Sequence, residues 1–279
     1  MTTAFVLGGG GVLGAVEVGM LRALFERGVT PELVLGTSVG ALNGALVASD
    51  PTPAVIERLT ELWRGAAASG KEVYGDRALR TVRRAMSTGT HIYSSQPLKQ
   101  RLVEELGDVT FEELPVRLQV CAASIERASE HWFDSGPVVE AVVASAAVPG
   151  LLPPAEIDGE HYLDGGIVNS IPLGRAVQLG ATRVFVLQVG RIDRPLVPPR
   201  RPWEVARVSF EIARRHRFNR ELAELPAGVE AHVLPARGTS SKDDSLLGTR
   251  DFSSVQERID ATYVASAAYL DEHLDPGLS

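Results

Sequence analysis

The fold is decided by the stretch Leu33-Val34-Leu35-Gly36-Thr37-Ser38-Val39-Gly40-Ala41-Leu42-Asn43-Gly44. A short apolar run, typical of a buried strand, stops at Gly-x-Ser-x-Gly and is followed by small residues that favour a helix. This order predicts a nucleophile elbow, a sharp strand-to-helix turn with Ser38 at its tip. Gly36 and Gly40 lack a Cβ, so the helix can pack close to the strand and a substrate can approach the serine. The N-terminus of that helix would point its amides at an oxyanion forming beside Ser38.

A glycine-rich loop precedes this stretch, between an expected strand at 4–7 and an expected helix at 15–27. It reads Gly8-Gly9-Gly10-Gly11-Val12-Leu13-Gly14. Strand, loop, helix and strand form a βαβ unit, so the strands at 4–7 and 33–36 should be parallel with a right-handed crossover. Adjacent parallel strands bring both loops to the same sheet edge. The bare amides of the glycine loop would then form an oxyanion hole beside the elbow.

A base is also needed, because a serine hydroxyl is a weak nucleophile until its proton is removed. In an α/β-hydrolase the elbow follows several strands and the order is Ser, acid, His, whereas here the elbow closes the second strand. The sequence has six histidines, none in a distinctive loop motif: His91, His131, His161, His216, His232 and His273.

Asp164 is the better candidate for the base. It ends an expected strand, and Gly165 and Gly166 allow a tight turn that leaves the carboxylate facing a cleft. A carboxylate within hydrogen-bond reach can accept a serine proton directly. Taken alone, Asp-Gly-Gly also fits a simple turn, so the assignment depends on Ser38 and the glycine loop.

The rest of the chain alternates helices and strands. The expected helices cover 39–49, 53–66, 76–87, 96–105, 137–147, 203–225 and 253–274, and the expected strands 116–124, 131–134, 182–189 and 230–235. The irregular part around Gly70, Gly75 and Gly89 is a candidate for a lid or a variable insertion, and the loop at 236–252 is expected to be mobile. The segments after the Pro- and Arg-rich connection at 191–202 are too few for a second core. We therefore expect a single domain over 1–279, with a motif-bearing core at 4–190 and 203–274 packed on it.

Composition narrows the function classes. The net charge of −7 argues against a general nucleic-acid binder, and 44% hydrophobic residues suffice for a sizeable core. The one cysteine, Cys121, lies in an apolar run and is expected to be an inert buried thiol in a reducing compartment. Without a signal-peptide pattern or a long apolar run, the sequence predicts a soluble, cytoplasmic protein. His, Cys and acidic residues lack metal-ligand spacing, so neither a metal nor a cofactor is expected.

Together the motifs resemble the three signatures of patatin-like phospholipases, in the family's order and spacing: Gly9–Gly14, Gly36–Gly40 and Asp164–Gly166. The segment Ala144-Ser145-Ala146-Ala147-Val148-Pro149 resembles the family's Ala-Ser-x-Ala-x-Pro segment. Asn169 and Pro172 stand where the family often has Asn and Pro. The resemblance covers roughly residues 4–190. It implies an α/β fold, three-layer α/β/α with a mainly parallel central sheet, and hydrolysis of acyl esters of lipids by a Ser–Asp dyad.

Carried over residue by residue, the resemblance makes Ser38 the nucleophile and Asp164 its base. The amides of the glycine loop, foremost Gly10 and Gly11, would form the oxyanion hole. The supporting glycines are Gly9, Gly14, Gly36, Gly40, Gly165 and Gly166. One departure is Leu13, which stands where the family usually has Arg or Lys. The missing charge implies weaker recognition of an anionic phosphate head group, with less effect on ester hydrolysis.

Two other function classes stay open on the sequence alone. Gly9-x-Gly11-x-x-Gly14 fits the dinucleotide fingerprint of an oxidoreductase, but the second strand ends in Gly36-Thr37-Ser38 where the fingerprint needs an acid for the ribose. A hydrolase-like scaffold that binds without turnover is the other class. Intact Ser38 and Asp164 oppose that reading.

Contact with a membrane surface is a further possibility. The expected long helix carries a basic cluster close to Phe210 and Phe218, made of Arg214, Arg215, His216, Arg217 and Arg220. Such a cluster can lie on anionic lipid. Pairing with Glu211, Glu221 and Glu224 on a solvated helix face is the favoured interpretation.

Overall fold

The computed structural model describes the chain except for residues 75–89, 191, 193–194, 238–254 and 275–279. Within the described residues, eight strands form one sheet in the order β5-β6-β3-β2-β1-β7-β8, with β4 also paired to β3. The strands are β1 (Thr3–Leu7), β2 (Leu33–Thr37), β3 (Arg117–Ser124), β4 (Ser129–Phe133), β5 (Ala155–Ile157), β6 (Glu160–Asp164), β7 (Arg183–Leu187) and β8 (Glu230–Val233).

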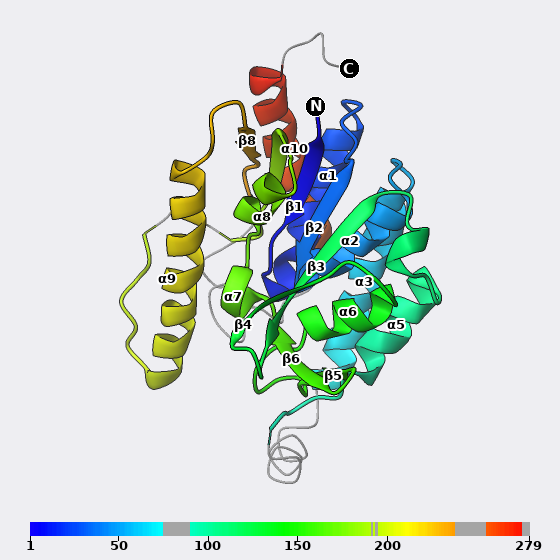
Figure 1. The fold of residues 1–279 in the computed structure, drawn as a ribbon, viewed down its shortest axis with the longest axis vertical. Helices are drawn as coiled ribbons and strands as arrows, with labels where there is room; N and C mark the ends of the chain where they lie inside the picture. The colour runs from blue at the N-terminus through cyan, green and yellow to red at the C-terminus, as the bar shows by residue number, and fades with distance from the viewer. Residues whose placement is uncertain (75–89, 191, 193–194, 238–254, 275–279) are drawn as a thin grey trace.

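Helices cover both faces of this sheet (Figure 1). One face carries α1 (Ala15–Phe25), α2 (Val39–Ser49), α3 (Val55–Tyr74), α5 (Gln96–Leu106), α6 (Val138–Ser145) and α10 (Val255–His273). The other carries α7 (Gly166–Asn169), α8 (Leu173–Gln178) and α9 (Pro202–Ala223). Two 3-10 turns complete the described elements, η1 (Gly11–Gly14) and η2 (Phe111–Glu113).

The central strands are buried on both faces, and their side chains alternate between two cores. In β1, Phe5 and Leu7 belong to the core under α1 and α2, while Ala4 and Val6 belong to the core under α8 and α9. Strand β7 divides its side chains between the same two cores. A strand with helices on both faces needs apolar residues at every position, which is why these runs are continuously apolar. The architecture is the expected three-layer α/β/α.

The sheet is mixed. Strands β8, β7, β1, β2 and β3 pair in parallel, including the β1–β2 pair of the expected βαβ unit. Strands β4 and β6 run antiparallel to β3, and β5 runs antiparallel to β6. The described sheet is therefore parallel through its centre and antiparallel at one side.

Strands β2 and β6 share one edge of β3. Strand β2 pairs with β3 up to Thr37 opposite Cys121, and β6 pairs with it from the other direction down to Asp164 opposite Ala122. Strand β4 pairs with residues 120–124 and so occupies the opposite edge of β3. The carboxyl ends of β2 and β6 therefore meet head to head at two consecutive residues of β3.

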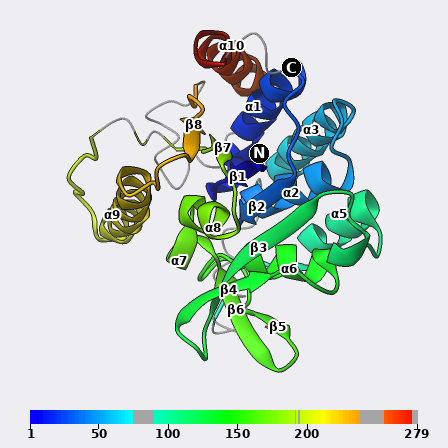
Figure 2. The same ribbon diagram turned by 45° about the horizontal axis from the view of Figure 1, so that its top comes forward.

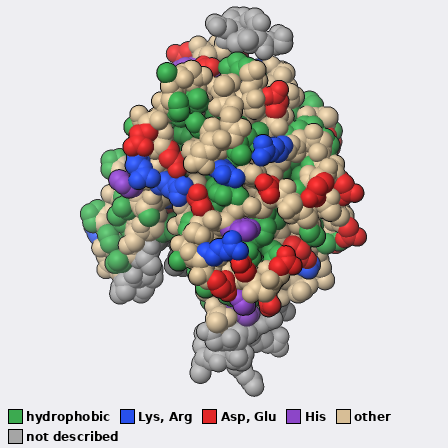
Figure 3. Space-filling view, viewed as in Figure 1, with side chains coloured by type: hydrophobic (Ala, Val, Ile, Leu, Met, Phe, Trp, Pro, Cys, Tyr) green, Lys and Arg blue, Asp and Glu red, His purple; other side chains and the backbone are tan. Residues whose placement is uncertain are grey.

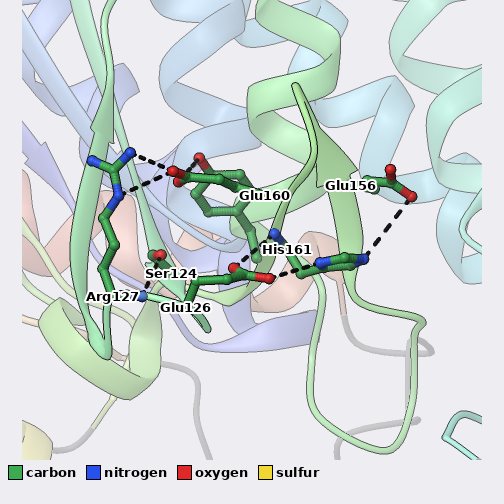
Figure 4. Close-up of polar contacts among 7 residues, drawn as sticks. Ser124, Glu126, Arg127, Glu156, Glu160 and His161 are labelled. Atoms are coloured by element: carbon green, nitrogen blue, oxygen red, sulfur yellow. Dashed lines mark hydrogen bonds and ion pairs between the residues drawn. The ribbon is translucent and has the colours of Figure 1, made fainter.

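A polar network anchors the start of β6 to the turn after β3 (Figure 4). The Glu126 carboxylate accepts the amide of His161 at 2.9 Å and lies 2.8 Å from its Nδ1. Arg127 pairs with Glu160, and Glu160 also accepts the hydroxyl of Tyr162 at 3.1 Å. These contacts fix the strand whose far end carries Asp164.

The expected boundaries differ from the structure in a few places. Helix α3 runs to Tyr74, past Gly70, which the sequence assigned to an irregular lid; the expected helix at 76–87 lies outside the described residues. The expected mobile loop at 236–252 is described only at its start. The helix expected at 15–27 is preceded by η1 and ends at Phe25. Short elements that the sequence did not indicate are β5, α7 and α8.

Candidate active site

Ser38 lies at the turn between β2 and α2, as the motif predicted. Strand β2 ends at Thr37, α2 begins at Val39, and Ser38 between them has φ 56° and ψ −123°. A positive φ is unusual for a residue with a Cβ. The conformation is strained, so it persists only where the surroundings enforce it. Ser38 is only 6% exposed. The backbone thus holds the hydroxyl at the carboxyl edge of the sheet, at the N-terminus of a helix.

The two glycines of the elbow allow close packing. A Cβ added to Gly36 would lie 2.5 Å from Cα of Ala41, in the helix that follows the turn. A Cβ on Gly40 would lie 2.3 Å from the carbonyl oxygen of Leu7, at the end of β1. Both contacts are with backbone atoms, so neither could relax by moving a side chain.

Asp164 faces the serine directly. The Ser38 hydroxyl donates to Asp164 Oδ2 at 2.6 Å, and the amide of Gly166 donates to Asp164 Oδ1 at 2.7 Å. One carboxylate oxygen therefore contacts the serine while the other is held by the first residue of α7. The two residues are 126 positions apart in the chain and meet because β2 and β6 end at neighbouring residues of β3.

Burial controls the acidity of this carboxyl. Removal from water raises the pKa of Asp164 to about 6, while the hydrogen bonds from Ser38 and Gly166 pull it down. At this pKa the carboxyl changes its charge close to neutral pH.

Gly165 and Gly166 shape the turn after Asp164. A Cβ on Gly165 would lie 2.2 Å from the carbonyl oxygen of Cys121, so the chain passes β3 at a distance that only glycine permits. At Gly166 a Cβ would lie 3.1 Å from the ring of Phe210, on α9. Phe210 is 41% exposed and lies beside Gly166.

The glycine loop lies beside the elbow. A Cβ on Gly9 would be 3.4 Å from Cβ of Ser38. The Gly9 amide donates to the carbonyl of Ser170 at 2.9 Å, so it serves to hold the loop. Among contacts between described residues, the amides of Gly10 and Gly11 have no acceptor. They are among the backbone amides beside Ser38 that no described residue accepts.

The other loop glycines have separate structural reasons. Gly11 has φ 59°, a conformation that L residues rarely adopt. A Cβ on Gly10 would lie 1.8 Å from the Val189 side chain, and one on Gly14 would lie 2.2 Å from Val39. The loop is thus pressed between the end of β7 and the first turn of α2.

A buried polar chain behind the loop was not indicated by the sequence. Glu17 is fully buried in α1 and accepts Asn43 Nδ2 at 2.7 Å, while Trp63 Nε1 donates to Asn43 Oδ1 at 3.1 Å. Asn43 Nδ2 also donates to the carbonyl of Gly14 at 3.0 Å. Burial raises the pKa of Glu17 and so favours its neutral form. The chain ties α1, α2 and α3 together behind the two loops of the site.

The histidines do not complete a triad. Among the hydrogen bonds between described residues, none joins a histidine to Ser38 or Asp164. His131 lies in an aromatic cluster with Phe133 and Tyr162, and His232 stacks on Phe185 at 4.9 Å.

The basic cluster of α9 is paired in part with Glu211 and Glu221, as the favoured interpretation expected, but Arg214 is buried and does not lie on a solvated face. Glu211 accepts Arg214 at 2.8 Å and Arg215 at 3.2 Å. Arg217 pairs with both Glu221 and Glu130 at 2.9 Å and donates to the carbonyl of Val168. Phe218 belongs to the core and cannot contact a lipid surface. On the face shown in Figure 3, Lys and Arg side chains are interspersed with Asp and Glu.

The remaining His, Cys and acidic side chains and the lengths of the helices bear on whether the chain could hold a metal or span a membrane. Within the described residues, no three His, Cys, Asp or Glu side chains gather as metal ligands would. Cys121 is buried, and burial raises the pKa of its thiol, which keeps it protonated as expected. No helix in the described part of the chain is long and apolar enough to cross a bilayer.

Comparison with known proteins gives consistent matches. A family profile described as patatin-like phospholipase matches residues 5–177. Lysophospholipase nte1 of Aspergillus terreus is 30% identical over 192 residues, covering 69% of this chain and 12% of that protein. Patatin-like phospholipase domain-containing protein ZK370.4 of Caenorhabditis elegans is 36% identical over 192 residues, covering 67% of this chain and 14% of that protein. The chain thus matches about an eighth of the length of these relatives.

Among solved structures, VipD from Legionella pneumophila aligns over 98% of this chain and 67% of that one, with a TM-score of 0.49 and 16% identity.

Proposed function

Because the chain belongs to the patatin-like phospholipase family, we propose that it hydrolyses carboxylic ester bonds of lipids through Ser38 and Asp164. The observation that carries this proposal is the 2.6 Å hydrogen bond from the Ser38 hydroxyl to Asp164 Oδ2. A nucleophile and a base within hydrogen-bond reach are the minimum for acyl transfer. Membership in this family also removes the support for the oxidoreductase reading of the glycine loop.

The first half of the reaction forms an acyl-enzyme. Asp164 Oδ2 takes the proton of Ser38 as Oγ bonds to the ester carbonyl carbon, and the carbonyl oxygen becomes an oxyanion. When the tetrahedral intermediate collapses, the bond to the leaving alcohol breaks and the alcohol oxygen takes the proton back from Asp164. The acyl group then remains on Ser38 Oγ.

Water completes the turnover. Asp164 removes a proton from water as the water oxygen attacks the acyl carbon, and the second tetrahedral intermediate releases Ser38 Oγ. The proton returns from Asp164 to Oγ, so a fatty acid leaves and the enzyme is restored. One carboxylate serves as base and acid in both halves, which suits a pKa of about 6.

The glycine loop would stabilise both oxyanions. Gly10 and Gly11 carry amides that no described residue accepts, and Gly9 packs against Ser38. Donors placed in advance at the developing charge contribute about 3–4 kcal/mol each in comparable sites. The N-terminus of α2 adds its dipole at Ser38.

The substrate class is a lipid acyl ester, of the phospholipase, lysophospholipase or carboxylesterase type. Relatives named lysophospholipase support a lipid substrate. Leu13 puts no positive charge in the loop, which favours hydrolysis of esters with less dependence on a phosphate head group. A cytoplasmic location and contact with a membrane surface stay predictions.

Covalent labelling tests the nucleophile. A fluorophosphonate probe should label the wild-type protein at Ser38, and Ser38→Ala should not be labelled. Ser266→Ala is a suitable control, because Ser266 is a fully buried serine in the remote helix α10. Labelling that persists in Ser38→Ala would exclude Ser38 as the nucleophile.

Turnover tests the base and separates an enzyme from a binding module. A panel of p-nitrophenyl esters, lysophospholipids, phospholipids and neutral glycerides should reveal hydrolysis by the wild type and its loss in Asp164→Asn. Retained turnover in Asp164→Asn would exclude Asp164 as the base. A wild type that binds these lipids and hydrolyses none would favour the binding module.

A further inference from the structure

Ser145, the last residue of α6, is buried beneath the elbow. Its Oγ accepts the amide proton of Ser38 at 2.8 Å and donates its own proton to the carbonyl of Cys121 at 2.6 Å. The residue is 0% exposed, so no water replaces either bond. Its hydroxyl therefore connects the amide of the nucleophile to the backbone of β3.

This hydroxyl stands where the sheet is interrupted. Strands β2 and β3 pair up to Thr37 opposite Cys121, and in a continuing parallel ladder the next amide, that of Ser38, would bond to β3. The positive φ of Ser38 takes the chain out of the sheet at this point. A hydroxyl can accept and donate at once, so Ser145 bridges the two backbone groups that have separated.

The same turn of chain also holds the strand end that carries Asp164. The carbonyl of Ala147 accepts the amide of Asp164 at 2.9 Å, and the carbonyl of Ser145 accepts the amide of Gly165 at 3.2 Å. The segment from Ser145 to Ala147 thus contacts the Ser38 backbone through a side chain and the backbones of Asp164 and Gly165 through one carbonyl each.

We propose that Ser145 is a positioning residue that fixes the Ser38 hydroxyl relative to the Asp164 carboxylate. The inference rests on the proposed function of that pair. Strained backbone such as the elbow persists only where its surroundings over-determine it, and the Ser38 amide is one of the groups that hold it. Without the Ser145 hydroxyl, a buried amide and a buried carbonyl lose their partners and the elbow is free to relax.

Ser145→Ala should lower kcat at least tenfold with little change in KM, because substrate contacts remain while the attack geometry is lost. The rate of fluorophosphonate labelling should fall in parallel. The acidic limb of the pH profile should also move to higher pH, since a weaker hydrogen bond from Ser38 no longer lowers the pKa of Asp164. Ser145→Thr, which keeps the hydroxyl, should recover much of kcat.

Thr262→Val is the matched control. Thr262 is a fully buried hydroxyl in α10 that donates to the carbonyl of Arg237 at 2.8 Å and accepts its amide at 3.3 Å. Thr262→Val therefore loses the same kind of hydrogen bonds as Ser145→Ala, but at a place away from Ser38 and Asp164. We expect a lower melting temperature in both variants and a lower kcat in Ser145→Ala alone.

The outcomes are separable. Wild-type kcat and pH profile in folded Ser145→Ala, or an equal loss of kcat in Thr262→Val, would overturn the positioning role while the function of Ser38 stands. Turnover that survives Ser38→Ala would overturn the proposed function itself. If Ser145→Ala yields no folded protein, Ser145→Cys, with a weakly bonding thiol, should show the same loss of kcat, and wild-type kcat there would overturn the role.

Discussion

At the scale of single residues, we expect Asp164 to set how the site responds to pH. Its carboxyl must be ionised to accept the Ser38 proton, and burial raises its pKa to about 6. We expect kcat/KM for a p-nitrophenyl ester to rise with pH through an ionisation near 6 and then level off. One pH unit below that ionisation, kcat/KM should be about tenfold lower than on the plateau. A profile that stays flat from pH 4.5 to 7 would show that another group is the base.

The same carboxyl should cost the protein stability at neutral pH. Its folded pKa of about 6 lies above the ordinary value of 3.8, so the ionised form is disfavoured by folding, and stability falls as pH rises from about 4 to about 6. Two pKa units correspond to about 3 kcal/mol. We expect Asp164→Asn to raise the free energy of unfolding by up to that amount at pH 7 and to change it little at pH 4.

Chemical denaturation at both pH values measures this difference. Asn can accept the Gly166 amide through its oxygen and donate to Ser38 Oγ through its amide nitrogen, so the variant keeps one hydrogen bond to each of these two partners. A variant that is less stable than the wild type at pH 7 would contradict the expected cost of burying this charge.

The sequence indicated Ser38, Asp164 and the glycines because each stands in a short contiguous motif. The structure brings Ser38 and Asp164 into contact, as the motif order indicated, while their catalytic roles stay predictions. The contacts of the supporting groups could not be found in this way. The segment Ala144–Pro149 stood out by its resemblance to a family motif, but nothing in it indicated that Ser145, 107 residues from Ser38, accepts the Ser38 amide. Glu17 belongs to no motif in the sequence. Its burial follows from the packing of α1 against α2, which carries its partner Asn43.

At the scale of elements, the contact between α2 and β1 depends on Gly40. A Cβ there would lie 2.3 Å from the carbonyl oxygen of Leu7, a backbone atom of a buried strand. We expect Gly40→Ala to lower the free energy of unfolding by about 3 kcal/mol or more, as overpacking of a core does. Thermal unfolding with activity measured on the folded fraction would show both the loss and any distortion of the elbow.

Gly65→Ala is the control for that substitution. Gly65 also lies inside a helix, α3, but its added Cβ would meet only the end of the Arg101 side chain at 3.5 Å. Alanine favours helix over glycine by up to about 1 kcal/mol, so this variant should be slightly more stable than the wild type. Equal destabilisation of both variants would show that helix propensity, not the Leu7 contact, explains Gly40.

Elements with a continuous apolar run or sufficient length could be predicted from the sequence, and the shortest elements could not. Strands β1, β2, β3 and β7 were indicated by continuous apolar runs, and α9 and α10 by length. Strand β5, with three residues, and α7, with four, are too short for any periodicity to appear. The antiparallel direction of β4 and β6 depends on long-range pairing with β3, which local sequence does not encode.

At the scale of the whole molecule, the C-terminal helix packs on the first one (Figure 2). A Cβ on Gly19, in α1, would lie 2.3 Å from the carbonyl oxygen of Ile259, in α10. Arg27 and Asp271 pair at 2.7 Å across the same contact. Helix α10 lies outside the residues that the family profile matches, yet it covers the helix that follows the glycine loop. We propose that the two parts fold as one unit.

Gly19→Val tests this proposal. The valine should force α10 away from α1 and lower the melting temperature of the whole chain in one transition. Circular dichroism, tryptophan fluorescence and residual esterase activity should then give the same midpoint. A variant that loses helix content at a lower temperature than activity would show that α10 folds separately.

Because β2 and β6 end head to head on β3, the register of β3 determines how far apart Ser38 and Asp164 lie. Thr37 pairs with Cys121, and Asp164 pairs with Ala122, the next residue of β3. The distance between Ser38 and Asp164 therefore follows from the register of β2 and β6 on this one strand. Insertions in the loops between β3 and β6, outside β4 and α6, can lengthen the connection to β6 and leave that register intact. One residue inserted in β3 between Cys121 and Ala122 would displace the Asp164 carboxylate by roughly 3.3 Å, the rise of a strand per residue, and would turn it toward the opposite face of the sheet.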